Sequence, residues 1–315
     1  MATINNIIFM GTPEFAVPTL QALLDHGENV VAVICQPDRP KGRGRKVQPP
    51  PVKMLAEKHG ITVLQPTKIR TEAFHNELLT YKPDLFIVTA YGRILPESLL
   101  SLPPLGTINV HGSLLPKYRG AAPVQRAILN GDGQTGITIM QMDAGMDTGD
   151  ILLPKTMPIQ ADDTSSTLAV KMSALGGQLL VQALDLLRED KLPPTIQNND
   201  FATDAPMLTK DEAPIDWYHS ATQISCQIRG LDPWPKATTT LGKKWLRPYK
   251  PVVLDAPTSQ PPGTIIHVSK EGISVATGDG VLQFHEIQLE GKKRMAVDAF
   301  ILGYQLQAGQ VLGHV

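Results

Sequence analysis

The sequence has few cysteines, almost no net charge and no long apolar run. Its two cysteines, Cys35 and Cys226, lie far apart among 315 residues, which excludes a disulfide framework and a cysteine-based zinc site. The 30 acidic residues balance 29 basic ones, and 42% of residues are hydrophobic, which excludes a disordered chain. The sequence has no run of about 18 apolar residues and no basic, apolar leader, so we expect no membrane span, no secretion and a cytoplasmic location.

The first part of the chain alternates short apolar runs with segments of helical periodicity. The apolar runs typical of strands are residues 6–10, 30–35, 84–90, 107–111 and 136–142. The segments with helical spacing are residues 15–25, 51–59 and 72–79. Apolar strands separated by helices are typical of an α/β fold with a doubly wound, parallel, Rossmann-like sheet. Such sheets bind ligands beyond the carboxyl ends of their strands.

The pattern changes near residue 190. At roughly 100–200 residues per domain the length fits two domains, and we expect a first domain over 1–189, a linker over 190–208 and a second domain over 209–315. The second domain has short alternating segments separated by glycine, which predict a small antiparallel β-barrel. Its expected strands are 263–269, 272–277 and 281–287, and its expected helices are 219–229 and 296–302.

The turn after the first strand lacks the motifs of nucleotide sites. Gly11-Thr12-Pro13 does not begin a G-x-G-x-x-G sequence, there is no Walker A sequence, and Pro13 removes one backbone donor. A tight strand-to-helix turn is the simplest interpretation, and a nicotinamide oxidoreductase is disfavoured.

Two polar side chains stand at the end of an otherwise apolar run. Asn109 and His111 are two residues apart in the predicted strand, so they point to the same face at its carboxyl end. A lone histidine is more often structural, but burying an amide and an imidazole side by side without partners is unfavourable. The pair is therefore a candidate catalytic site.

A compact acidic loop follows the next predicted strand and contains Asp143, Asp147 and Asp150. Three interpretations are a metal site, a solvated turn, and a carboxylate that orients His111. A calcium loop needs a closing Glu, which is absent, so we expect no metal. The spacing alone does not decide which aspartate would meet His111.

Residues 36–46 hold five cations and one acid in a chain without excess positive charge. We interpret this segment as an arm that contacts phosphates, with a flexible solvated loop as the alternative. A second stretch has no acid between Asp232 and Asp255 and gives a weaker indication of a basic surface. Its cations are Lys236, Lys243, Lys244, Arg247 and Lys250.

Several longer motifs resemble the methionyl-tRNA formyltransferase family over nearly the whole chain. They are Gly11–Ala16, Gln36–Pro40 with Gly42–Gly44, His111–Pro123, Gln141–Asp150 and Pro233–Pro235. The Asn-x-His and Ser-Leu-Leu-Pro elements are shared with other folate-dependent formyltransferases. The basic segment and the acidic loop are typical of the tRNA enzyme.

The resemblance implies the substrates and the site residues. It implies a first domain that binds 10-formyltetrahydrofolate as formyl donor, and an OB-like second domain that helps to hold methionyl-initiator tRNA. Its catalytic residues map to Asn109, His111 and Asp147, without a metal. Its folate contacts map to Ser113, Leu114, Leu115, Pro116, Arg93, Leu95, Asp143 and Ala144. Its tRNA contacts map to Arg39, Lys41, Arg43, Arg45 and Lys46.

The chemistry implied is direct acyl transfer to an uncharged amine by a monomeric enzyme of translation initiation. We expect no formyl-enzyme intermediate, because Ser113 lacks the G-x-S-x-G elbow of a nucleophile. A formyltransferase acting on an amino-sugar nucleotide is one alternative, although it has no use for the basic segment. A non-catalytic RNA-binding protein is another, although it gives no reason for Asn109 and His111. A glycinamide ribonucleotide formyltransferase leaves the second domain unexplained, and a serine hydrolase has the least support.

Overall fold

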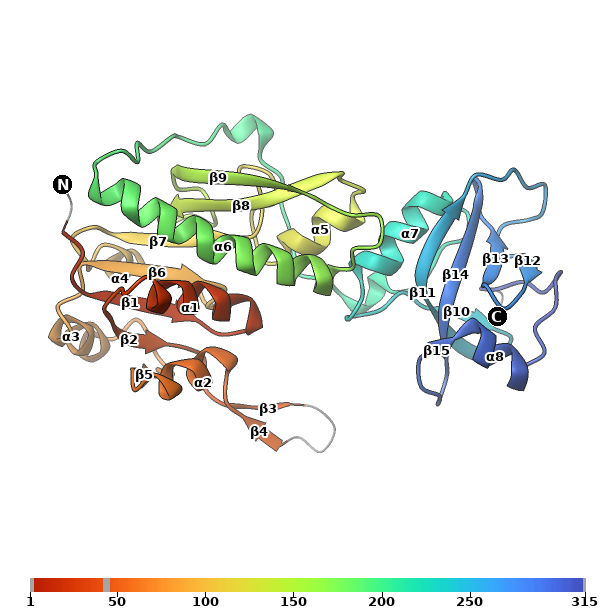
Figure 1. Ribbon diagram of the computed structural model, residues 1–315, viewed down its shortest axis with the longest axis horizontal. Helices are drawn as coiled ribbons and strands as arrows, with labels where there is room; N and C mark the ends of the chain where they lie inside the picture. The colour runs from red at the N-terminus through yellow and green to blue at the C-terminus, as the bar shows by residue number, and fades with distance from the viewer. Residues whose placement is uncertain (1–2, 42–45, 314–315) are drawn as a thin grey trace. The chain divides into compact units, whose positions relative to one another are not determined.

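The computed structural model describes residues 3–41 and 46–313 (Figure 1). The chain folds as two compact units whose segments interleave along the sequence. Unit 1 consists of Met1–Pro123, Thr135–Met157 and Ala169–Ala205. Unit 2 consists of Val124–Gln134, Pro158–Leu168 and Pro206–Val315. Unit 1 therefore extends into the segment expected to be a linker.

Unit 1 is built on a seven-stranded sheet with the order β5-β2-β1-β6-β7-β8-β9. Its strands are β1 (Ile7–Gly11), β2 (Val30–Ile34), β5 (Thr62–Leu64), β6 (Leu85–Thr89), β7 (Thr107–His111), β8 (Gln134–Gln141) and β9 (Ile151–Pro158). The strands from β5 to β7 pair in parallel, and β1, β6 and β7 are buried throughout. The predicted doubly wound α/β sheet is confirmed.

The expectation of a wholly parallel sheet was wrong at β8. This strand pairs antiparallel with β7, and His111 lies opposite Thr138 while Ile108 lies opposite Gln141. The chain therefore turns back at the carboxyl end of β7, through a segment that contains α5 (Pro123–Leu129), instead of crossing a face of the sheet. The later part of β8, from Thr138 to Met140, consequently lies beside the candidate catalytic residues.

Helices cover the sheet of unit 1. They are η1 (Glu14–Ala16), α1 (Val17–Asp25), α2 (Pro51–Lys58), α3 (Glu72–Thr80), α4 (Glu97–Leu100) and α6 (Ser165–Arg188). The predicted helices 51–59 and 72–79 are present, whereas 15–25 divides into η1 and α1. Figure 1 shows α6 lying along the sheet beside α1. A Cβ on Gly177 would lie 2.8 Å from the Pro18 carbonyl oxygen, and one on Gly176 would lie 2.9 Å from Val110, so these glycines permit the close packing.

Unit 2 contains a curled antiparallel sheet with the order β10-β11-β14-β13-β12, and β15 pairs with β14. Its elements are α7 (Ala221–Gly230), β10 (Thr239–Leu241), β11 (Lys244–Leu254), β12 (Ile265–Val268), β13 (Ile273–Ala276), β14 (Val281–Leu289), β15 (Met295–Ala296) and α8 (Val297–Gly303). The predicted OB-like second domain is confirmed as a curled antiparallel sheet. Among the described residues, no helix combines the length and the apolar character that crossing a membrane requires.

An ion pair inside unit 2 gives the first testable prediction. Arg126 donates to both carboxylate oxygens of Glu212, at 2.5 and 3.2 Å, and joins α5 to η3 (Lys210–Glu212). Burial alone raises the pKa of Glu212, but the hydrogen bonds from Arg126 and from the Thr209 backbone outweigh burial and lower this pKa below its ordinary value. The pair therefore stabilises the fold at neutral pH, and its contribution is lost as the pH falls through the lowered pKa.

We expect Glu212→Gln to reduce the free energy of unfolding by about 1 kcal/mol at pH 7 and by less in acid. All three tryptophans, Trp217, Trp234 and Trp245, lie in unit 2, so urea unfolding followed by their fluorescence measures this unit. Asp211→Asn, in the same 3-10 turn, is the matched control. An equal loss at pH 7 and at pH 3 would contradict the assignment.

Candidate active site

Asn109 and His111 lie at the carboxyl end of β7, between β6 and β8. They are 8% and 5% exposed, and Asn109 pairs with Val88 of β6 and Met140 of β8. Among the residues that the structure describes, none hydrogen-bonds to the Asn109 side-chain amide. Nearly buried polar groups are normally paired, so this amide is a donor available to a ligand.

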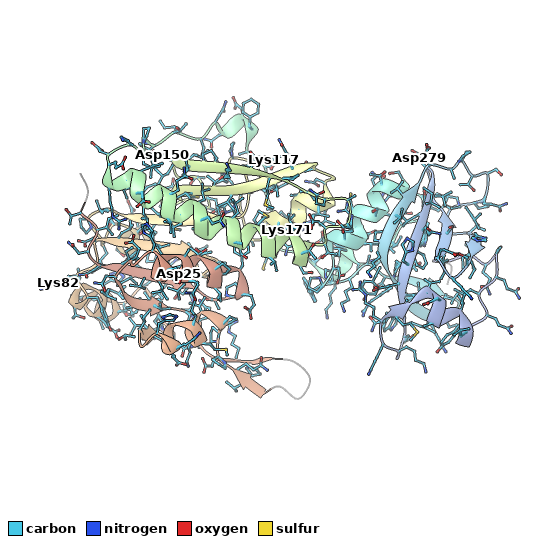
Figure 2. All side chains as sticks on the ribbon, in the orientation of Figure 1. Asp25, Lys82, Lys117, Asp150, Lys171 and Asp279 are labelled. Atoms are coloured by element: carbon cyan, nitrogen blue, oxygen red, sulfur yellow. The ribbon has the colours of Figure 1, made fainter. Side chains whose placement is uncertain are left out.

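The imidazole of His111 lies between a carbonyl group and a carboxylate. Its Nε2 is 2.9 Å from the carbonyl oxygen of Tyr118, and its Nδ1 is 3.6 Å from Oδ1 of Asp147. A carbonyl oxygen only accepts, so Nε2 carries the hydrogen and Nδ1 of the neutral ring is free to take a proton. The carboxylate of Asp147 therefore lies beside the ring nitrogen that carries no hydrogen. The Gly120 amide, in the loop after β7, hydrogen-bonds to Asp147, in the loop after β8. Lys117 of the first loop and Asp150 of the second are labelled in Figure 2.

The loop after β8 brings Asp147, and not its neighbours, to the imidazole. Oδ2 of Asp147 accepts a hydrogen bond from the Gly120 amide at 2.8 Å. Asp143 instead accepts from the Thr148 hydroxyl at 2.7 Å. The tight return of the loop requires Gly149, because a Cβ there would collide with the Gln141 carbonyl oxygen. Within the described part of the chain, no cluster of three or more His, Cys, Asp or Glu side chains is arranged to hold a metal.

The residues expected to contact folate follow His111 in a tightly held turn. Ser113 is fully buried, and its hydroxyl donates to the Lys117 carbonyl at 2.7 Å. The Leu115 amide donates to the Thr138 hydroxyl at 3.1 Å, which ties the turn to β8. Leu114 and Pro116 are half-buried beside them. Because the Ser113 hydroxyl already donates to a backbone carbonyl, it forms no serine–histidine pair with His111.

The other expected folate residues lie in two separate loops. Arg93, after β6, donates to the side chain of Gln36 at 3.1 Å and to the carbonyls of Pro66 and Thr67. Leu95 is 4% exposed and packs in the apolar cluster of unit 1. Asp143 and Ala144 are exposed in the loop after β8. Gln36, whose side chain accepts from the Arg93 guanidinium, was part of the Gln36–Pro40 motif, but the sequence did not indicate this contact.

The basic segment, interpreted from the sequence as a phosphate-contacting arm, contains two strands, β3 (Arg39–Lys41) and β4 (Lys46–Gln48), which pair antiparallel as a hairpin. Arg39 is exposed; Arg43 and Arg45 lie outside the described residues, as do the side chains of Lys41 and Lys46. After the hairpin, Gln48 is the last residue of β4 and Pro51 begins α2. Lys53 anchors the base of the hairpin by donating to both oxygens of Asp38 at 3.0 and 3.1 Å.

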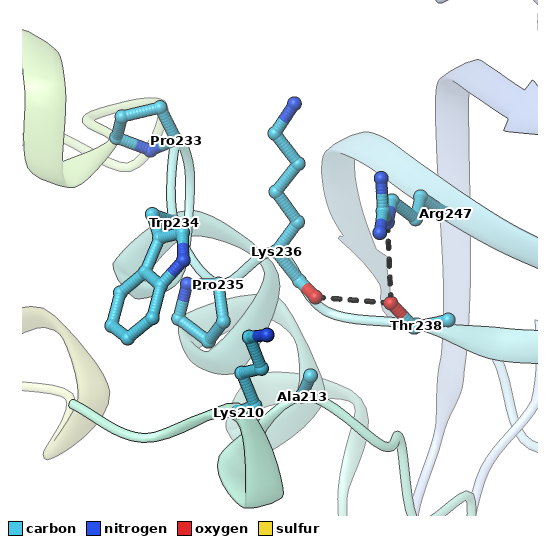
Figure 3. Close-up of a pocket in the computed structure, with 8 residues that line it drawn as sticks. All are labelled: Lys210, Ala213, Pro233, Trp234, Pro235, Lys236, Thr238 and Arg247. Atoms are coloured by element: carbon cyan, nitrogen blue, oxygen red, sulfur yellow. Dashed lines mark hydrogen bonds between the residues drawn. The ribbon is translucent and has the colours of Figure 1, made fainter. Parts of the chain in front are cut away.

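Unit 2 contains a pocket of about 410 Å³ (Figure 3). Its lining residues are Lys210, Ala213, Pro233, Trp234, Pro235, Lys236, Thr238 and Arg247. Three of the eight are cations and none is an acid, and the Trp234 ring is half exposed. Of the predicted second basic surface, Lys236 and Arg247 thus share this pocket, whereas Lys250 pairs with Glu286.

The two domains of the chain are those of a formyl transferase. A family profile described as formyl transferase matches residues 5–184, and one described as formyl transferase, C-terminal domain, matches residues 207–305. A methionyl-tRNA formyltransferase from Desulfotalea psychrophila is 52% identical over 97% of this chain and 95% of its own. Another methionyl-tRNA formyltransferase, from Citrifermentans bemidjiense, is 50% identical over 98% of this chain and 96% of its own. The chain belongs to the methionyl-tRNA formyltransferase family.

The fold of the chain is also similar to that of a solved structure. It is the N-formyltransferase from Helicobacter canadensis, in complex with folinic acid and dTDP-3-aminofucose, with a TM-score of 0.65. It is 19% identical, and the match covers 90% of this chain and 98% of that chain. At this identity the likeness concerns the fold alone.

Proposed function

We propose that this protein transfers the formyl group of 10-formyltetrahydrofolate to the amino group of methionyl-initiator tRNA, and so supports translation initiation as a cytoplasmic monomer. The observation that carries the proposal is the pairing of His111 with Asp147 beside the free amide of Asn109, in a chain of this family. Residues 1–189 are proposed to bind folate and transfer the formyl group. Residues 209–315 are proposed to bind tRNA, with 190–208 joining the two.

The three side chains have complementary tasks in formyl transfer. As the amine attacks, negative charge develops on the formyl oxygen, and the Asn109 amide donates to it without changing its own protonation state. The amine must lose a proton, which Nδ1 of His111 accepts directly or through water. The carboxylate of Asp147, 3.6 Å from Nδ1, stabilises the imidazolium that results. None of these steps needs a metal.

Folate is proposed to lie along Ser113–Pro116, Arg93 and Leu95, which follow β7 and β6, and along Asp143 and Ala144 in the loop after β8. The held turn at Ser113–Pro116 supplies rigid backbone groups next to His111. The hydroxyl of Ser113 is directed to carbonyl groups, which supports direct transfer without a formyl-serine.

The tRNA is proposed to contact the basic hairpin through Arg39, Lys41, Arg43, Arg45 and Lys46, and unit 2 through the pocket of Figure 3. Trp234 offers a ring on which a base can stack, and Lys236 and Arg247 offer charges for phosphates.

We expect Trp234→Ala to raise the KM for methionyl-tRNA about 10-fold, which corresponds to the loss of roughly 1.4 kcal/mol of base stacking. The KM for the folate donor is expected to stay unchanged. Steady-state kinetics with each substrate varied in turn measure both. Tyr218→Ala, which removes another exposed ring of unit 2 outside this pocket, is the matched control. Equal effects of the two variants would refute a tRNA role for the pocket.

The proposed function is tested by offering the protein 10-formyltetrahydrofolate with methionyl-initiator tRNA, and separately with a dTDP-amino sugar. Formylation of the aminoacyl-tRNA alone supports the proposal. Formylation of the sugar nucleotide alone would assign the chain to the other acceptor. Binding of tRNA without turnover would indicate an RNA-binding protein.

A further inference from the structure

The backbone of Asp147 has a conformation that side-chain-bearing residues rarely adopt. Its φ is +55°, in the left-handed region that favours glycine. Neighbouring contacts must therefore maintain the conformation that directs the carboxylate toward His111.

One buried side chain binds the backbone on both sides of Thr148. Gln197 is 5% exposed, and its Nε2 donates to the carbonyl oxygens of Asp147, at 2.8 Å, and of Gly149, at 2.6 Å. These two bonds use both hydrogens of the amide group, so the amide has one orientation. Gln197 thus restrains the peptide that carries the Asp147 side chain.

The other end of the same amide is fixed by Arg119. Nε and Nη2 of Arg119 donate to Oε1 of Gln197 at 3.1 and 2.8 Å. The next residue, Gly120, donates its amide hydrogen to the Asp147 carboxylate. Asp147 is therefore held twice, at its carbonyl through Gln197 and at its carboxylate through Gly120, and Arg119 links the two contacts.

The segment that carries Gln197 is itself bound to unit 1. The Arg119 amide donates to the Thr203 carbonyl at 2.8 Å, and the Ala205 amide donates to the Arg119 carbonyl at 2.6 Å. Thr195 exchanges two backbone hydrogen bonds with Ile151 at the start of β9. This part of the expected linker is thus part of the active-site support.

We propose that Gln197 is a positioning residue for formyl transfer, which acts by keeping the Asp147 carboxylate at Nδ1 of His111. The inference rests on the proposed function, because it gives Gln197 a role only through Asp147. Among the described residues, the side chain of Gln197 hydrogen-bonds to Asp147, Gly149 and Arg119 and to none of the residues expected to bind folate or tRNA. We therefore expect its loss to affect kcat and not the KM of either substrate.

Gln197→Glu is the sharpest variant. It keeps the size of the side chain and an oxygen for Arg119, but it places an acceptor against two carbonyl oxygens in place of a donor. We expect kcat to fall about 10- to 100-fold, with both KM values within about 2-fold of wild type. Gln197→Leu, which lacks both the donor and the acceptor, is likewise expected to lower kcat while leaving both KM values nearly unchanged. Asn198→Ala is the matched control, because Asn198 only caps η2 (Asn199–Phe201) in the same segment.

A double-mutant cycle separates positioning from a general structural effect. If Gln197 acts through Asp147, Gln197→Glu lowers kcat no further in an Asp147→Asn background. Losses that multiply in the double variant would overturn the inference, as would a Gln197→Glu enzyme with wild-type kcat. These results leave the proposed function intact when the wild type formylates methionyl-tRNA and Asp147→Asn is impaired. A wild type that formylates no methionyl-tRNA refutes the proposed function itself.

Discussion

Replacing Asn109 with alanine is expected to lower kcat for formyl transfer about 10²–10³-fold, because the developing oxyanion loses its side-chain donor. The amide has no partner among the described residues, so its removal leaves no buried group unpaired, and the thermal midpoint should change little. Asn109→Asp keeps the shape and places a negative charge beside the oxyanion, so its loss is expected to be larger.

Single-turnover kinetics with saturating substrates measure this effect without interference from product release. An Asn109→Ala enzyme within about 3-fold of wild type would exclude the oxyanion role, since the loss of one such donor typically costs roughly 2.7–4 kcal/mol.

Removing the proton acceptor is the second large effect. We expect His111→Ala to lower kcat about 10²–10⁴-fold, as is usual for a general base. Asp147→Asn keeps an acceptor for the Gly120 amide but loses the charge that stabilises the imidazolium, so we expect a loss in the same direction.

Asp150→Asn, in the same loop, is the control for Asp147→Asn and is expected to retain near wild-type turnover. If the two aspartate variants were equally impaired, the loop would support the fold or the folate site instead of His111.

The sequence predicted the features that depend on neighbouring residues. Asn109 and His111 were identifiable because two polar side chains in an apolar strand need a partner or a ligand, and because strand alternation puts them on one face. The parallel sheet followed from apolar runs separated by helical periods. These inferences use only local spacing, which the fold preserves.

Features that depend on pairing between distant segments were not predictable in the same way. The antiparallel direction of β8 depends on where the chain turns after His111. Strand β11 was missed because Pro248 and Pro251 interrupt the usual pattern; beyond Leu246 it pairs with β14 but not with β10, so a proline can occupy its other edge.

The choice among the three loop aspartates needed coordinates or a resemblance, because all three have similar spacing from the preceding strand. Gln197 gave no signal at all, since a glutamine in a polar, proline-containing stretch is typical of a linker. Its two carbonyl partners lie about 50 residues away in sequence, at separations of 50 and 48.

The central claim is direct transfer of a formyl group from folate to methionyl-tRNA by Asn109, His111 and Asp147. It is tested most directly by a single turnover with 10-formyltetrahydrofolate carrying an isotopic label in its formyl group, quenched at short times, with label followed in protein and in tRNA. The account predicts that label passes into methionyl-tRNA without appearing on the protein, and that His111→Ala slows this passage. Label on Ser113 before tRNA, or unchanged transfer by the His111 variant, would contradict it.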